Sequence, residues 1–157
     1  MGRVCGLTAY LFEDVLAEGF NMFVNVDVRK IGGAGHTDIE CLYLSCKKKF
    51  AVEAKSTANK LMGINSGRLR EHRKEIGGEY TIVITPKYVP ATKRDIYGNP
   101  IVIILASTFS EYLYNHIYHD VRDMDYKDFD NIIVNNLGTD ISRLISDMTM
   151  QKFATKG

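Results

Sequence analysis

The run Ile101–Ala106 is continuously apolar, and it constrains the fold of this chain more than any other segment. A short run of this kind suits a strand buried on both faces. The run Tyr80–Thr85 is rich in β-branched residues and predicts a second strand. A helix that begins near Asn59 or Asn65 and ends at Ile76 is expected before it, with Gly77 as a natural stop. We therefore expect a sheet that is covered by helices on both sides.

A β-hairpin is predicted ahead of that helix. The strands Asp38–Cys46 and Phe50–Lys55 flank a polar turn at Lys47–Lys49. Valines alternate with polar residues over 24–29, which indicates a further half-buried strand. An antiparallel hairpin that leads into a β-helix-β crossover requires a mixed sheet, so the fold class is α/β.

Helices are expected at both ends of the chain. Apolar residues at helical spacing predict a first helix over roughly 6–18. The segment from Pro86 to Pro100 is expected to be a loop. After residue 107, three apolar stripes predict helices: Phe109, Leu113 and Ile117; Phe129, Ile132 and Ile133; and Ile141, Leu144, Ile145 and Met148. Thr139 or Asp140 is the expected N-cap of the last one.

Bulk composition excludes several classes of protein. A chain of 157 residues, 45% hydrophobic and 25% charged, is typical of one globular domain. A net charge of +1 gives no overall field that favours nucleic acid, so local patches would have to bind it. No run is long enough to span a membrane, no signal peptide is visible, and the three cysteines have no zinc-binding spacing. We expect reduced thiols and a cytoplasmic location, and Met1-Gly2 suggests a domain excised from a longer chain.

The polar residues of the predicted hairpin suggest chemistry. Glu53 and Lys55 are two positions apart on one strand and should share a face, and Asp38 can lie beside them on the paired strand. Two carboxylates can hold Mg²⁺, which activates a water for phosphodiester hydrolysis, and the carbonyl of Ala54 is a further candidate ligand. Lys55 would either orient and deprotonate that water or stabilise the phosphate.

This order of elements and residues resembles the PD-(D/E)xK nuclease superfamily, which includes restriction endonucleases and archaeal Holliday-junction resolvases. The resemblance implies that Asp38 and Glu53 are the metal-binding acids and that Lys55 is the catalytic lysine. Many members add an acid on the first helix, for which Glu13 is the best match and Asp14 the alternative.

The resemblance covers roughly residues 6–106, and Thr37 stands where the family often has proline. Chain size and a basic helix over 66–76 look most similar to cleavage domains of type IIS restriction endonucleases, with residues 1–157 as a single nuclease domain. The resemblance implies one or two Mg²⁺ ions and double-stranded DNA as substrate. It also implies a homodimer, or pairing with a second nuclease subunit or a recognition domain. A junction resolvase and a non-catalytic DNA-binding module are the alternatives.

Each functional interpretation has a structural alternative. The acids and Lys55 could form a cross-strand salt bridge, and Glu40 is expected to be a solvated strand residue. The basic residues of the 66–76 helix either contact DNA phosphates or form a solvated helix face: Arg68, Arg70, Arg73 and Lys74.

The remaining candidates are interpreted as structural. His36 is expected to be a turn residue and His72 to pack at the core edge. His116 and His119 lack an evident third metal ligand. Tyr112, Tyr114 and Tyr118 are expected to be core and surface residues of one helix rather than a base-stacking platform.

Overall fold

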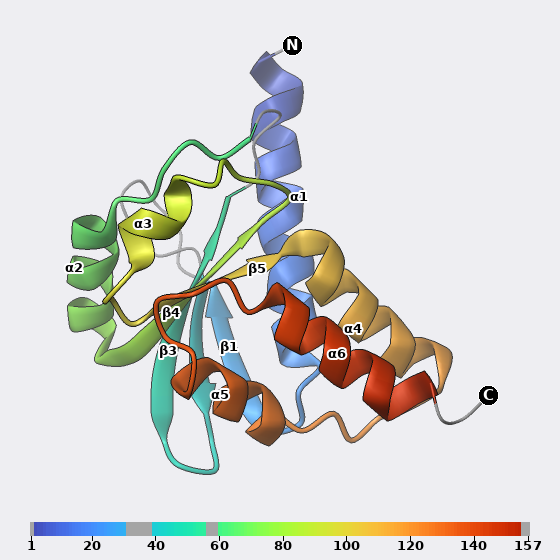
Figure 1. The fold of residues 1–157 in the computed structure, drawn as a ribbon. Coiled ribbons are helices and arrows are strands. Elements are labelled where there is room, and N and C mark those ends of the chain that lie inside the picture. The colour runs from blue at the N-terminus through green and yellow to red at the C-terminus, as the bar shows by residue number, and fades with distance from the viewer. Residues whose placement is uncertain (1, 31–38, 56–59, 155–157) are drawn as a thin grey trace.

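The computed structural model describes residues 2–30, 39–55 and 60–154, with side chains from residue 12 onward (Figure 1). The helices are α1 (Gly2–Asn21), α2 (Ser66–Ile76), α3 (Thr92–Ile96), α4 (Ala106–Tyr118), α5 (Lys127–Val134) and α6 (Ser142–Phe153). The strands are β1 (Val26–Lys30), β2 (Ile39–Tyr43), β3 (Lys48–Ala54), β4 (Gly78–Thr85) and β5 (Ile101–Leu105).

Within the described residues, the strands form a five-stranded sheet in the order β1-β2-β3-β4-β5. β2 pairs antiparallel with both β1 and β3, whereas β4 pairs parallel with both β3 and β5. Parallel neighbours need crossover connections, which α2 and α3 provide. The predicted mixed sheet is therefore confirmed.

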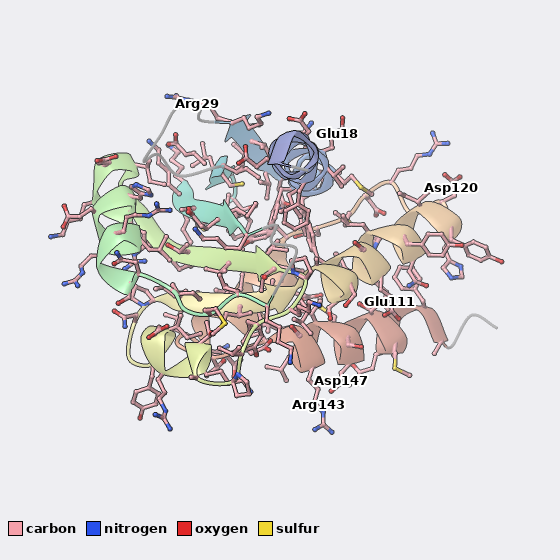
Figure 2. The ribbon with its side chains drawn as sticks, turned by 90° about the horizontal axis from the view of Figure 1, so that it is seen from above. Glu18, Arg29, Glu111, Asp120, Arg143 and Asp147 are labelled. Atoms are coloured by element: carbon pink, nitrogen blue, oxygen red, sulfur yellow. The ribbon has the colours of Figure 1, made fainter. Side chains whose placement is uncertain are left out.

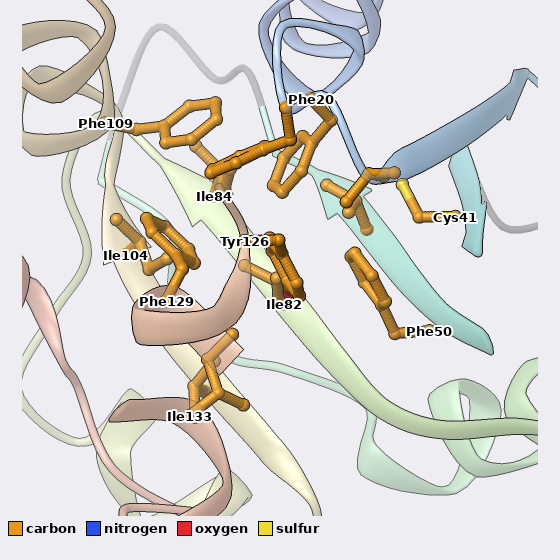
Figure 3. Close-up of a cluster of buried hydrophobic side chains, with 14 of the residues drawn as sticks. Phe20, Cys41, Phe50, Ile82, Ile84, Ile104, Phe109, Tyr126, Phe129 and Ile133 are labelled. Carbon is orange, nitrogen blue, oxygen red and sulfur yellow. The ribbon is translucent and has the colours of Figure 1, made fainter. Parts of the chain in front are cut away.

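The sheet separates two groups of helices (Figure 1), and an apolar layer lies on each of its faces. The larger layer lies against α1, α4, α5 and α6, and its centre is aromatic: Phe50 stacks on Tyr126 with ring centroids 4.9 Å apart (Figure 3). The smaller layer lies beneath α2 and α3 and contains Leu69, Val83 and Ile103. β5 contributes residues to both layers, as the continuous apolar run over 101–106 predicted.

A buried polar network ties the start of β3 to α5. Lys48 Nζ lies 2.9 Å from Asp130 Oδ2, and Tyr80 donates its hydroxyl hydrogen to Asp130 Oδ1 at 2.7 Å. The hydroxyls of Tyr80 and Tyr126 are also 2.7 Å apart. Burial opposes the charge on Lys48, but its hydrogen bond to Asp130 and the charge of Asp130 together raise the pKa of Lys48.

Several boundaries differ from the predictions. The hairpin turn covers residues 44–47, so β3 begins at Lys48 and the expected turn Lys47–Lys49 was placed too late. The expected loop Pro86–Pro100 contains α3. The last helix begins at Ser142 with Ile141 at its N-cap position, although Asp140 still accepts a hydrogen bond from the Ser142 amide at 2.9 Å.

The predicted apolar stripes of the last helices are only partly buried. Phe109 is buried, but Ile117 is 65% exposed, and Leu144 is 41% exposed. Ile117 lies in the last turn of α4 and Leu144 in the first turn of α6, so helical spacing alone did not separate buried from exposed positions. No helix among the described residues is long and apolar enough to cross a membrane.

Candidate active site

Glu53 and Lys55 lie side by side on the face of β3 that is turned toward α2. Strand alternation places Phe50 and Val52 in the larger apolar layer, so Glu53 points the other way. Lys55 Nζ lies 3.3 Å from Glu53 Oε1, which confirms the predicted common face. The Lys55 amide donates to the Ile84 carbonyl at 2.9 Å, which holds the backbone of Lys55 against β4.

The Glu53 carboxylate is buried, and only one of its two oxygens has a partner among the described residues. Its side chain is 2% exposed. Oε1 accepts a hydrogen bond from Arg68 Nη2 at 2.6 Å and is also the atom nearest Lys55. Oε2 is buried and has no hydrogen-bond partner among the described residues. Burying a carboxylate oxygen without a partner is costly, so a cation bound at Oε2 would be favourable.

The N-terminus of α2 brings Arg68 to this carboxylate. Asn65 caps the helix by accepting the Arg68 amide at 3.0 Å. The segment before the cap is held by Asp95 of α3, whose Oδ2 accepts the Ile64 amide at 2.9 Å. Lys55, Asn65 and Arg68 line a pocket of about 210 Å³ at this helix end. Asp95 was not a sequence candidate, and no local pattern around it indicates this anchoring contact.

Two predicted residues near the hairpin lie outside the described residues, namely Asp38 and His36. Glu13 lies on α1, which packs against the opposite face of the sheet from Glu53. No hydrogen bond or ion pair joins Glu13 to Glu53 or Lys55 within the described part of the chain. The supporting role of Glu13 stays a prediction. Asp14, the alternative acid, forms an ion pair with Lys30 at the end of β1.

The four basic residues of α2 do not form one exposed face, which corrects that expectation. Arg73 is 5% exposed and donates from Nη1 to Thr81 Oγ1 at 3.0 Å. Burial and the nearby charge of Arg70 lower the pKa of Arg73. Arg68, Arg70 and Lys74 are exposed. Arg68 binds Glu53, and Arg70 and Lys74 border an open hollow of about 570 Å³ at the C-terminal end of α2.

Other polar candidates have structural contacts. His72 is 5% exposed, which confirms its packing at the core edge. Glu40 was expected to be solvated, but its side chain is 13% exposed. It lies 3.8 Å from Arg29 and 3.6 Å from Lys49, so two cations compensate its charge.

His116 of α4 makes protein contacts through both ring nitrogens, and His119, which follows α4, stacks on Phe153. His116 is fully buried, with Nδ1 2.7 Å from the Tyr112 carbonyl and Nε2 2.8 Å from Lys152 Nζ. Tyr112 is 3% exposed whereas Tyr118 is 70% exposed, so core and surface positions of one helix are confirmed. No three His, Cys, Asp or Glu side chains gather as a metal-binding group in the part of the chain that is described.

The mixed sheet with helices on both faces, and with an acid and a lysine at the end of its third strand, is an α/β fold of the restriction-endonuclease type. The crystal structure of the small subunit (R.BspD6I2) of the heterodimeric restriction endonuclease R.BspD6I superposes with a TM-score of 0.59. The match covers 92% of this chain and 90% of that subunit at 15% identity. No protein-family model matches the chain.

A relative in sequence is the type II restriction enzyme HgaI of Avibacterium volantium. The two sequences are 54% identical over 146 residues, which is 93% of this chain. The chain spans about 30% of the length of that enzyme.

Proposed function

We propose that this chain is the cleavage domain of a type II, IIS-like restriction endonuclease that hydrolyses DNA phosphodiester bonds with Mg²⁺. The observation that carries this proposal is the contact between the buried Glu53 carboxylate and Lys55 at the end of β3. Two further findings support the proposal: the fold is of the restriction-endonuclease type, and the sequence is similar to part of a type II restriction enzyme.

The donor atoms around Glu53 suit a hard divalent cation. Glu53 Oε2 is a buried carboxylate oxygen without a hydrogen-bond partner among the described residues. Asp38 is outside those residues, but its chain neighbour Ile39 pairs with Val52, which directly precedes Glu53. Asp38, Glu53 and the Ala54 carbonyl are the proposed ligands, and Mg²⁺ favours such oxygen atoms.

The metal supplies two effects when bound: it lowers the pKa of a coordinated water and neutralises charge on the phosphate. Lys55 holds its ammonium group beside the carboxylate, where it can position the attacking water or stabilise the phosphate oxygens. Backbone pairing with β4 limits the movement of Lys55 relative to Glu53. Orientation of this kind is worth several orders of magnitude in rate.

Arg70 and Lys74 are the proposed contacts to the DNA backbone. Both are exposed and border the hollow at the C-terminal end of α2, whose wall also includes the buried Arg73. Cations in this position supply sequence-independent affinity for phosphates. Sequence reading is proposed to belong to a separate domain, because the related HgaI is much longer than this chain.

Cutting both strands of a duplex requires two such sites. We therefore propose that the domain acts as a homodimer or beside a second nuclease subunit. The small subunit that shares this fold belongs to a heterodimeric restriction endonuclease, which supports pairing of this kind.

The test is nicking and cutting of plasmid DNA by the 157-residue chain in Mg²⁺, with Lys55→Ala as the critical variant. Lys127→Ala is the matched control, because Lys127 is exposed on α5 at the opposite face of the sheet. We expect Lys55→Ala to lose at least about a hundredfold in rate and Lys127→Ala to keep it. Equal activity of folded Lys55→Ala and wild type would refute the assignment.

Two further substrates and one binding assay separate the alternatives. A four-way junction cut faster than a linear duplex would favour a resolvase. Salt-dependent binding of duplex DNA without any Mg²⁺-dependent cutting would favour a non-catalytic module.

A further inference from the structure

Two cations hold the same oxygen of Glu53. Arg68 Nη2 lies 2.6 Å and Lys55 Nζ 3.3 Å from Oε1, while Oε2 has no partner among the described residues. The local charge of the buried carboxylate is thus already compensated without a metal ion. A divalent cation that binds Glu53 must therefore compete with Arg68 and Lys55 for this carboxylate.

Arg68 is the more displaceable of the two cations. Its side chain is 43% exposed, whereas that of Lys55 is 29% exposed and projects from a strand whose backbone is paired with β4. Arg68 also lines the pocket of about 210 Å³ at the N-terminus of α2. A long guanidinium side chain at the mouth of a pocket can rotate from the carboxylate into that space.

The chemistry of arginine makes a phosphate the natural alternative partner. A guanidinium binds carboxylate and phosphate oxygens in the same planar, charge-assisted manner. Lys55 lines the same pocket, so a phosphate there would meet two cations. The helix N-terminus adds a favourable partial positive charge.

We infer that Arg68 is the counter-ion of the metal-binding Glu53 carboxylate. In the free protein Arg68 pairs with this carboxylate, and it leaves the carboxylate when its guanidinium binds a DNA phosphate. Arg68 is therefore a positioning residue that couples DNA binding to metal binding. The coupling is reciprocal, since whatever weakens the contact between Arg68 and Glu53 favours the metal ion. This inference rests on the proposed function of the same site.

The coupling is measured by calorimetric titration of Ca²⁺ into the protein, with and without duplex DNA. The critical variant is Arg68→Gln, which keeps a hydrogen-bond donor for the buried Glu53 but removes the charge. Arg68→Ala is the second variant. Arg143→Ala is the matched control, because Arg143 points away from α6 into solvent (Figure 2).

Without DNA, we expect Arg68→Gln to bind Ca²⁺ at least about fivefold more tightly than wild type, the lower end of typical couplings between sites. Arg143→Ala should bind like wild type. DNA should tighten Ca²⁺ binding more in wild type than in Arg68→Gln, since the variant has no guanidinium to withdraw. Thermal unfolding without metal checks that each variant is folded.

Equal or weaker Ca²⁺ binding by both folded Arg68 variants would overturn the inference, while DNA cutting by wild type would leave the proposed function intact. Absence of both Ca²⁺ binding and DNA cutting in wild type would overturn the proposed function and the inference together. An equal effect of DNA on wild type and Arg68→Gln would also refute the role of Arg68.

Discussion

Replacing Asp130 by alanine should destabilise the protein strongly. Asp130 is 6% exposed and accepts hydrogen bonds from Lys48 at 2.9 Å and Tyr80 at 2.7 Å. Removing one partner of a buried ion pair costs about 3–5 kcal/mol, because the other charge stays buried without compensation. The Lys48 side chain keeps 17% exposure, so we expect the lower end, about 3 kcal/mol.

The measurement is equilibrium unfolding in urea, with the stability change taken from the midpoint at constant slope. Asp147→Ala is the control, since Asp147 projects from α6 into solvent (Figure 2) and should change stability by less than about 0.5 kcal/mol. The double variant Lys48→Met/Asp130→Ala removes both charges and should recover most of the loss.

The double variant distinguishes the ion pair from simple loss of packing. If the loss came from the cavity that alanine leaves at position 130, changing Lys48 would not restore stability. If it came from the uncompensated charge of Lys48, removing that charge would restore it. A loss below about 1 kcal/mol in Asp130→Ala would refute the reasoning. So would a double variant no more stable than Asp130→Ala.

Burial lowers the pKa of His116 below its ordinary value of 6.5, so its contribution to stability is complete above that pH and is lost as pH falls. Urea midpoints between about pH 7 and pH 5 should fall more steeply for wild type than for His116→Gln, and parallel curves would contradict this. Arg70→Ala/Lys74→Ala should weaken duplex binding and flatten its salt dependence, by about 0.9 in logarithmic slope per lost phosphate contact. An unchanged slope would exclude these residues from the DNA interface. Phe50→Ala should cost about 3–5 kcal/mol in urea unfolding, because Phe50 is fully buried against Tyr126. A cost below about 1 kcal/mol would show that the aromatic layer collapses around the gap.

The sheet could be predicted because its signals are local. The apolar run Ile101–Ala106 indicated a strand covered on both sides, and β5 contributes to both apolar layers. The spacing of Glu53 and Lys55 determined their common face by backbone geometry alone, and their contact confirms it. Asn65 was one of two predicted helix starts, and its side chain is the N-cap of α2.

Contacts between residues distant in the chain were not predictable in this way. Lys48 looked like part of a solvated turn, but Asp130 compensates its charge and allows its burial. Arg73 was grouped with the possible DNA-binding residues because it is basic, yet its angular position on α2 directs its side chain toward Thr81. The contact of Arg68 with Glu53 depends on how α2 docks on the sheet, which no spacing in the sequence encodes.

The position of β3 between an antiparallel and a parallel neighbour has a consequence for folding. Pairing with β2 needs only a short turn, whereas pairing with β4 requires a long loop containing α2 to close first. Glu53 gains Arg68 as a partner only in that second, non-local step. The hairpin alone would leave the carboxylate hydrated, so the site should be completed late. Hydrogen exchange at the Lys55 amide, which is bonded to the Ile84 carbonyl, would report directly on this step.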